Sequence, residues 1–168
     1  QLKIRLKHNV NSTFYSRYTF YDLGYNFRTT EINGCIGNIQ LKYANKINRI
    51  RRDNFFEMAL PIYKRKDRYF PIKYNHIDFL SNFAIPVICR SKKIRDMLVE
   101  KCRDKVEIRP IVGGDMVLQP FFKKYIPKFV STYNNINAKI IHEQGLYFGN
   151  NPELTNKEMS DIKKIFTC

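Results

Sequence analysis

The sequence lacks several patterns that would place it in a common class of protein. Its cysteines, Cys35, Cys89, Cys102 and Cys168, include no Cys-x-x-Cys pair and have no histidine at ligand spacing, which argues against a zinc site and a disulfide framework. No apolar run approaches 18 residues, and no signal-peptide pattern is present. We therefore expect free thiols in a soluble, cytoplasmic protein without a metal or membrane partner.

Acidic residues are scarce. The chain of 168 residues has 30 lysines and arginines against 15 aspartates and glutamates, a net charge of +15. Such an excess is typical of proteins that bind nucleic acid or an anionic surface. The basic residues form no dense run, however, and aromatic residues do not alternate with them at a repeating spacing. We expect no sequence-specific nucleic-acid partner, and a locally basic site would equally suit a phosphate-bearing ligand.

One stretch near the N-terminus predicts a loop followed by a capped helix. It runs from Gly24 to Leu41 and reads GYNFRTTEINGCIGNIQL. Thr30 is a candidate N-cap, and from Ile32 onward apolar residues recur every three or four positions, which is the helical period. The pattern continues to about Lys66 and fits either two helices or one bent helix.

The residues just before this helix predict a phosphate site. Asn26 and Arg28 would stand beside the free N–H groups of the first turn, where the helix dipole favours an anion. An amide donates to a phosphate oxygen at any pH, and a guanidinium offers two parallel donors. Loop stabilisation by Asn26 and a solvated Arg28 are the open alternatives. Gly34 and Gly37, which weaken the helix, predict a close backbone approach there.

The rest of the sequence predicts a small α/β domain. We expect strands at 83–89, 106–112 and 145–149, helices at 91–102, 137–143 and from 155 onward, and over 1–23 a loop with a short strand. Pro86 would place its strand at an edge or bulge. Ser91 and Thr155 are candidate N-caps, the latter with Glu158 in a capping box. The helix after Ser91 would turn four residues inward, namely Ile94, Met97, Leu98 and Cys102.

Two polar residues of this domain are candidates for ligand binding. Arg109 lies at the centre of an otherwise apolar predicted strand, where an unpaired charge is costly to bury. It must emerge at a strand end or meet an anion, which could be substrate, a cofactor-bound intermediate or a protein carboxylate. His142 could act as an acid, a base or a donor, or cap the short helix as a structural residue. His8 and His76 have no companions, and we expect them at the surface.

Two further sequence blocks accompany the stretch from Gly24 to Leu41. They run from Glu107 to Pro120, EIRPIVGGDMVLQP, and from His142 to Asn150, HEQGLYFGN. Together the three blocks resemble the C-terminal half of the DegT/StrS family of pyridoxal-phosphate-dependent nucleotide-sugar enzymes. The two later blocks are most similar to the branch that holds 4-keto-6-deoxy-sugar 3-dehydratases and related lipopolysaccharide-biosynthesis aminotransferases.

The resemblance implies a fold. The chain would be the C-terminal part of a fold-type I pyridoxal-phosphate transferase, with 1–50 ending the large cofactor-binding domain and 51–168 forming the small α/β domain. The anchor residue, a lysine in the aminotransferases or a histidine in the 3-dehydratases, would precede Gln1. We therefore expect no catalytic residue in this chain and no activity from it alone. A complete protein with a processed N-terminus is the alternative.

The resemblance also implies ligands and partners. The full enzyme would be a homodimer that uses pyridoxal 5'-phosphate or pyridoxamine 5'-phosphate and acts on a nucleotide-linked 4-keto-6-deoxy sugar for surface polysaccharide. Asn26 would reach the cofactor phosphate of the neighbouring subunit. We expect Arg28, Arg109 and His142 to contact the substrate. Amino transfer and 3-dehydration are both open, and the alternatives of another class are a basic nucleic-acid-binding module and an inactive remnant.

Overall fold

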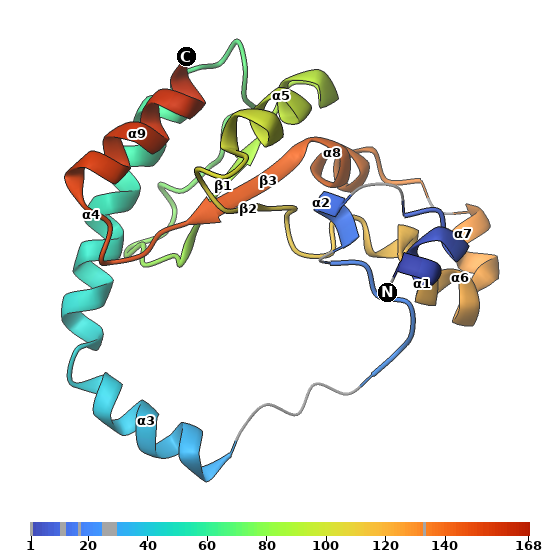
Figure 1. Ribbon diagram of the computed structural model, residues 1–168, viewed down its shortest axis with the longest axis horizontal. Coiled ribbons are helices and arrows are strands. Elements are labelled where there is room, and N and C mark those ends of the chain that lie inside the picture. Colours follow the sequence, from blue (N-terminus) through green and yellow to red (C-terminus); the bar gives the residue numbers. More distant parts are fainter. Residues whose placement is uncertain (1, 11–12, 17, 25–29, 133) are drawn as a thin grey trace.

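A small antiparallel sheet forms the centre of the fold (Figure 1). The computed structural model describes residues 2–10, 13–16, 18–24, 30–132 and 134–168. The strands β1 (Ala84–Ile88), β2 (Ile108–Arg109) and β3 (Gly145–Gly149) lie in the order β1-β3-β2. Pro86 of β1 stands opposite Tyr147 of β3. Because β1 is an edge strand of the sheet, the prediction for Pro86 is confirmed. A residue without an N–H is tolerated on such a strand.

Three helices pack against one face of the sheet, namely α4 (Ala44–Tyr63), α5 (Lys92–Cys102) and α9 (Asn156–Thr167). Helices α4 and α9 run side by side in Figure 1. Because side chains alternate along a strand, every second residue of β1 and β3 points into the core between sheet and helices. The buried cluster is formed mainly by Phe55, Met58, Ile62, Ile85, Val87, Leu98, Leu146, Phe148, Ile162 and Phe166.

Side-chain caps confirm two predicted helix starts. Ser91 Oγ accepts a hydrogen bond from the Ile94 amide at 3.3 Å at the start of α5. Thr155 Oγ1 accepts from the Glu158 amide at 3.3 Å, and Glu158 Oε2 accepts in return from the Thr155 amide at 2.8 Å. This reciprocal pair is the predicted capping box of α9, and it satisfies backbone donors that the first turn leaves unpaired.

Helix α5 differs from the prediction in the side chains that face the core. Leu98 and Cys102 are buried as expected, but Met97 is exposed, and Arg95 takes the inward position instead. Arg95, Leu98 and Cys102 follow one another at three and four residues, so they share one helix face. The apolar pattern alone could not reveal a buried arginine on that face.

The predicted helical run after Thr30 forms two helices, α3 (Glu31–Leu41) and α4. Thr30 Oγ1 accepts from the Asn33 amide at 3.4 Å, which confirms its capping role. No residue of α3 is buried. Gly34 and Gly37 face open space, because no atom of the described chain lies within 4 Å of the point where a Cβ would stand. The predicted close approach therefore does not occur among these residues.

The segments on either side of the core depart most from the prediction. Residues 2–7 and 13–16 form the short helices α1 (Leu2–Lys7) and α2 (Thr13–Ser16), where we expected loop and strand. The strand expected at 106–112 is reduced to β2, because Pro110 has no N–H for a ladder. A 3-10 turn at Met116–Leu118 and the short helices α6 (Pro120–Tyr125) and α7 (Pro127–Thr132) lie before α8 (Ile136–Gln144).

Three remaining expectations concern the chain as a whole. Helix α4 runs unbroken through residue 50, and the division into 1–50 and 51–168 stays a prediction. Among the described helices, none is both long and apolar enough to cross a bilayer. Burial raises the pKa of Cys89 to about 12 and that of Cys102 to about 11, so these two thiols act as apolar core residues.

Candidate functional site

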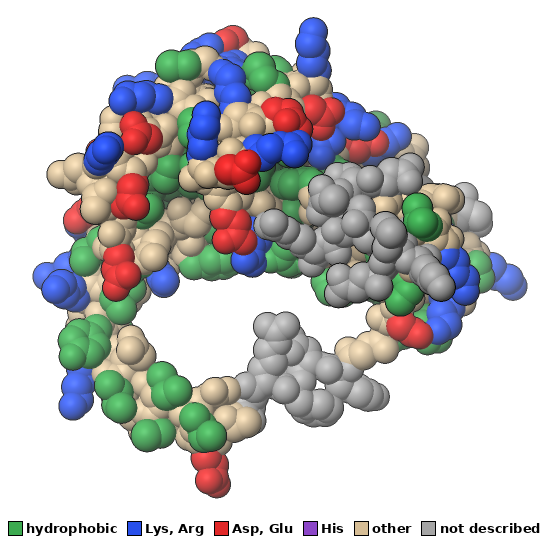
Figure 2. All heavy atoms as spheres, in the orientation of Figure 1, with side chains coloured by type: hydrophobic (Ala, Val, Ile, Leu, Met, Phe, Trp, Pro, Cys, Tyr) green, Lys and Arg blue, Asp and Glu red, His purple; other side chains and the backbone are tan. Residues whose placement is uncertain are grey.

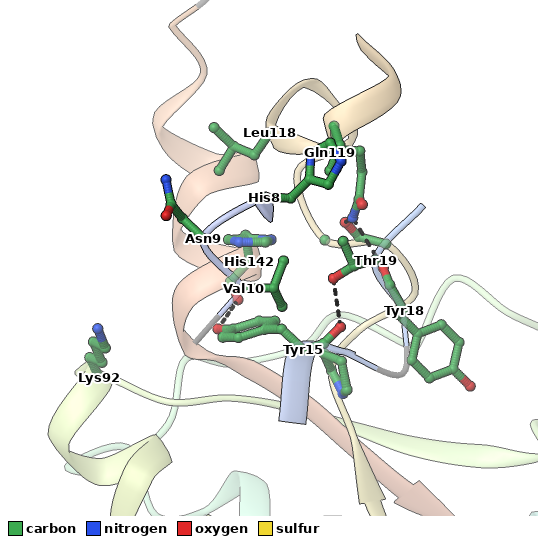
Figure 3. Close-up of a pocket in the computed structure, with 14 residues that line it drawn as sticks. His8, Asn9, Val10, Tyr15, Tyr18, Thr19, Lys92, Leu118, Gln119 and His142 are labelled. Carbon is green, nitrogen blue, oxygen red and sulfur yellow. Dashed lines mark hydrogen bonds between the residues drawn. The ribbon is translucent and has the colours of Figure 1, made fainter. Parts of the chain in front are cut away.

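A cavity of about 340 Å³ lies where the N-terminal segment meets the turn after β2 and helix α8 (Figure 3). The N-terminal segment contributes His8, Tyr15 and Tyr18 to the wall, and α8 contributes His142. Lys92, at the start of α5, lies at the side of the group in Figure 3. The N-terminal residues lie more than 120 positions from His142 in the sequence, so the cavity exists only in the folded chain.

The turn at Gly113 and Gly114 forms one wall. Both glycines have positive φ, +67° and +56°, a conformation that other residues adopt only with strain. Two adjacent glycines permit such a turn, because they lack the Cβ that makes positive φ costly. A Cβ on Gly114 would collide with the ring of His142. The turn is therefore shaped both by its own backbone and by the close approach of His142.

Gln119 joins this turn to the N-terminal segment and is itself buried. Its Nε2 donates to the Gly113 carbonyl at 2.9 Å and to the Tyr18 carbonyl at 3.1 Å. Its Oε1 accepts from the Phe20 amide at 2.9 Å. One side-chain amide thus satisfies three backbone groups from two distant segments, which fixes their spacing along the cavity.

His142 is held by three contacts. Its Nδ1 accepts from the Asp115 amide at 3.3 Å, its ring stacks on Tyr15 with centroids 5.0 Å apart, and its carbonyl accepts from the Tyr15 hydroxyl at 2.7 Å. Burial lowers the pKa of His142, against the opposing effect of Asp115 and Glu143. Because Nδ1 accepts a hydrogen bond, the neutral ring carries its proton on Nε2 and can donate there.

Arg109 lies beside this cavity at the end of β2 and is 43% exposed. Its guanidinium pairs with Glu107 at 2.7 Å and donates to the Tyr18 hydroxyl at 2.8 Å. The anion that Arg109 meets in the fold is therefore a protein carboxylate, that of Glu107, which is one of the three kinds of anion considered above. Glu107 first, and then Tyr18, raise the pKa of Arg109, which is charged at every relevant pH.

A second hollow, of about 250 Å³, adjoins Arg109 on the face of the sheet away from the core. Phe83 and Tyr147 flank it, with ring centroids 6.1 Å apart, and Gly149 lies in its wall. The Tyr147 hydroxyl lies 3.1 Å from that of Tyr18. Hydrogen bonds to Tyr147 and Arg109 lower the pKa of Tyr18. Tyr18 thus connects the two hollows through its carbonyl and its hydroxyl.

The predicted site residues are partly brought together. Arg109 and His142 lie on either side of the same N-terminal segment, which contacts the first through Tyr18 and the second through Tyr15. Asn26 and Arg28 lie outside the described residues. His8 is exposed as expected, but it has companions, because its ring lies 5.1 Å from that of Tyr21 and lines the cavity.

Sequence reasoning missed three residues of this site, Tyr15, Tyr18 and Gln119. Gln119 belongs to the quoted GGDMVLQP block, so the motif marked it without giving it a role. The two tyrosines lie in an aromatic segment that had no helical period to interpret. In the described ranges, no group of three or more His, Cys, Asp or Glu side chains is placed to hold a metal ion.

Comparison with known proteins gives consistent matches. A sequence model of the DegT/DnrJ/EryC1/StrS aminotransferase family matches residues 3–167. GDP-4-keto-6-deoxy-D-mannose 3-dehydratase of Escherichia coli O55:H7 (strain CB9615 / EPEC) is 32% identical over 146 residues, which cover 84% of this chain and 36% of that protein. The chain thus spans little more than a third of the length of this relative.

Solved structures agree. A crystal structure of GDP-4-keto-6-deoxymannose-3-dehydratase with a trapped PLP-glutamate geminal diamine superposes with a TM-score of 0.64 and 26% identity, covering 93% of this chain and 40% of that one. The E. coli enzyme with bound hydrated PLP gives a TM-score of 0.62 and 25% identity over the same shares. A mutant of the dehydratase ColD with bound GDP-perosamine gives 0.64 and 25%, again over 93% and 40%.

Proposed function

The chain belongs to the DegT/DnrJ/EryC1/StrS aminotransferase family, and from that premise we propose that it forms the C-terminal part of a pyridoxal-phosphate-dependent enzyme acting on a nucleotide-linked 4-keto-6-deoxy sugar. The observation that carries this proposal is the family match over 3–167, together with a fold shared with 3-dehydratases over 93% of the chain. Of the two reactions, we favour 3-dehydration, since the relatives named above are 3-dehydratases.

The described residues fit a supporting part of such a site. The cofactor, when bound, supplies the electron sink for chemistry at the sugar. In the family its anchor residue and the acidic partner of its ring lie in the preceding half. This chain would offer the capped start of α3, behind Asn26 and Arg28, to the cofactor phosphate of a neighbouring subunit. The remainder of its contribution would be to hold the substrate.

His142 and Arg109 support a substrate-binding role for the cavity wall. His142 carries a proton on Nε2, so it can donate a hydrogen bond to a sugar oxygen without changing its charge. Arg109 is 43% exposed beside an adjoining hollow, and its guanidinium suits the oxygens of a pyrophosphate. We propose that the two residues orient the nucleotide sugar from opposite sides of the segment that carries Tyr15 and Tyr18.

The face of α3 supports a homodimer. Ile32, Ile36 and Ile39 are 70%, 53% and 53% exposed and share one side of this helix. Figure 2 shows hydrophobic side chains on α3, at the lower left, away from the packed part of the molecule. Such an apolar face is stabilised by burial against another surface. A second subunit that covers α3 would also bring the Asn26 loop toward a neighbouring cofactor.

The enzyme proposal is tested with the complete protein, including any segment that precedes Gln1. Incubated with pyridoxamine 5'-phosphate and a GDP-linked 4-keto-6-deoxy sugar, it should give a 3-deoxy sugar, which mass spectrometry detects by the loss of one oxygen atom. The two electrons would come from pyridoxamine 5'-phosphate, which would be converted to pyridoxal 5'-phosphate with release of ammonia. Formation of an amino sugar instead would show amino transfer. If neither product forms while the cofactor remains bound, the proposed activity is wrong. The 168-residue chain alone should neither retain the cofactor through dialysis nor turn over the sugar.

Asn26 provides a test of the shared site. In the complete enzyme, Asn26→Ala should weaken cofactor retention about tenfold, because one hydrogen bond to a charged group contributes about 1.5–3 kcal/mol. In mixed dimers the damage should appear at the site anchored by the other subunit. The matched control, Asn38→Ala on α3, should leave retention unchanged. Damage that follows the subunit's own anchor would contradict the cross-dimer role.

The +15 charge favours one competing function, binding of nucleic acid. We expect this binding to be weak and independent of sequence, because scattered positive charges release counterions without reading bases. A filter-binding titration at physiological salt tests this. Sub-micromolar affinity with preference for one sequence would place the nucleic-acid function ahead of the enzyme.

A further inference from the structure

Arg95 is a buried cation in α5 whose surroundings are unusual. Its side chain is 4% exposed, whereas Asp96, the carboxylate 3.0 Å from its Nε, is 56% exposed. The geometry of that pair is not that of a hydrogen bond, so Nε has no hydrogen-bonded partner among the described residues. A buried guanidinium whose carboxylate partner is exposed is costly, and its position therefore requires further stabilisation.

Two aromatic rings of the N-terminal segment supply it. The Arg95 guanidinium carbon lies 5.6 Å from the ring centroid of Phe14 and 5.2 Å from that of Tyr15. A cation within about 6 Å of a ring face is attracted by the ring quadrupole, and more strongly when water is excluded. Arg95 thus attaches helix α2 to helix α5.

Tyr15 contacts both Arg95 and the cavity wall. Its ring lies against His142 at an interplanar angle of 18°, and its hydroxyl donates to the His142 carbonyl. His142 in turn accepts from the Asp115 amide and fills the space that a Cβ on Gly114 would need. A continuous series of contacts therefore runs from Arg95 to the turn that forms the cavity wall.

We propose that Arg95 is a positioning residue of the cavity, which holds the Tyr15 ring against His142 and thereby fixes the turn at Gly113–Asp115. The inference rests on the proposed function only in taking this cavity as a substrate site. The coupling itself is a property of the 168-residue chain and can be measured without cofactor or substrate.

Hydrogen exchange at the Asp115 amide measures the far end of this series. Arg95→Met keeps the unbranched stem of the side chain but removes the guanidinium and its charge. It should speed exchange of this amide about fivefold, which corresponds to the loss of about 1 kcal/mol that one hydrogen bond contributes. Arg103→Met is the matched control, because Arg103 is 66% exposed at the end of the same helix and pairs with Glu100. It should leave the Asp115 amide unchanged.

The His142 ring provides a second readout that a merely stabilising residue would not move. The charged groups that face this ring are Asp115 from the turn, Glu143 from α8 and Arg95 from α5, and His8 and Lys92 line the same cavity. Burial first, and the positive charge of Arg95 to a smaller extent, lower the pKa of His142, so Arg95→Met should shift the NMR titration of His142 to higher pH. Arg103→Met should not.

A double-mutant cycle separates transmission through Tyr15 from a general loosening. Tyr15→Leu should speed Asp115 exchange by itself, and adding Arg95→Met should then have little further effect. If Arg95→Met does not fold, Arg95→Lys, which keeps the charge but not the flat guanidinium, replaces it in the cycle. Additive effects, or lower thermal stability with unchanged exchange at Asp115, would overturn the proposal.

Kinetics of the complete enzyme distinguish this inference from the proposed function. If both hold, Arg95→Met raises KM for the nucleotide sugar more than it lowers kcat, because the variant displaces a binding wall. If Asp115 exchange responds while KM does not, the coupling stands and the cavity is not the substrate site.

Discussion

Helices α3 and α9 are alike in length and in the way they begin, yet they differ in everything that follows. Thr30 and Thr155 cap their first turns with the same hydroxyl-to-amide hydrogen bond, at 3.4 and 3.3 Å. Met159, Ile162 and Phe166 of α9 are buried against the core, whereas α3 buries no residue. A cap and an apolar period are therefore sufficient to specify a helix, but not to specify what covers it.

The apolar face of α3 would be difficult to explain if the described residues were its only environment. Isoleucines exposed in succession on one helix side are a liability unless another surface covers them. The face agrees with the proposed second subunit, which would also give Gly34 and Gly37 the close neighbour that the described residues do not provide. The buried residues of α9 thus stabilise the chain itself, whereas we expect the exposed isoleucines of α3 to stabilise the dimer.

The largest expected effect is in α9. Phe166 is fully buried, and its ring centroid lies 4.7 Å from that of Phe148. Phe166→Ala should lower the free energy of unfolding by about 3–5 kcal/mol, because the cavity adds to the lost transfer energy. Urea titration followed by circular dichroism measures this. Ile36→Ala in α3 is the matched truncation and should change stability by less than about 0.5 kcal/mol.

The two caps give a smaller effect that tests the same contrast. Thr155→Ala should lower the free energy of unfolding by about 1 kcal/mol, because it removes the hydroxyl that accepts from the Glu158 amide and leaves only the backbone half of the capping box. Thr30→Ala should leave the global transition unchanged and reduce only the helix content of α3. If Thr30→Ala and Thr155→Ala lowered the free energy of unfolding equally, α3 would fold cooperatively with the core. That result would contradict the contrast between α3 and α9.

Acid should act on the cavity side of the molecule. Because burial lowers the folded-state pKa of His142 below its unfolded value, its contribution to stability is complete above about pH 6.5 and is lost as pH falls below that value. The slope cannot exceed about 1.4 kcal/mol per pH unit for one proton. His142→Asn, whose side-chain oxygen can still accept from Asp115, should flatten urea midpoints measured between pH 7.5 and 5.5. An unchanged slope would assign the acid sensitivity to other groups.

The smallest change in the free energy of unfolding is expected at the exposed face of α3, where the change in dimer formation should be largest. Ile36→Lys places a charge on the exposed face of α3 and should change the free energy of unfolding of the 168-residue chain by less than about 0.5 kcal/mol. In the complete protein it should shift sedimentation from dimer to monomer. Lys46→Ile, a matched exchange at an exposed position of α4, should leave assembly unchanged. Dimers that persist in Ile36→Lys would show that another surface joins the subunits.

The candidate site shows where prediction from sequence ended. The Gly113–Gly114 turn followed from residue type, because two glycines permit positive φ. Arg109 was expected to meet an anion or to emerge at a strand end, and it does both at the end of β2. Its partner Glu107, which lies just before this strand of two residues, was not identified. Arg95 escaped notice because its buried charge is stabilised by rings about 80 residues away in the sequence, which no local pattern reveals.

The sequence by itself determined the local structure and the family. Caps at Ser91 and Thr155, the strand at 145–149 and the helical period after Thr30 depend on hydrogen bonds and spacings within a few residues, so they are legible in the chain. Only the tertiary structure decided which faces are covered and which polar groups meet. The contact of Tyr15 with His142 spans 127 residues, and such a pair forms only when the whole core has brought its ends together.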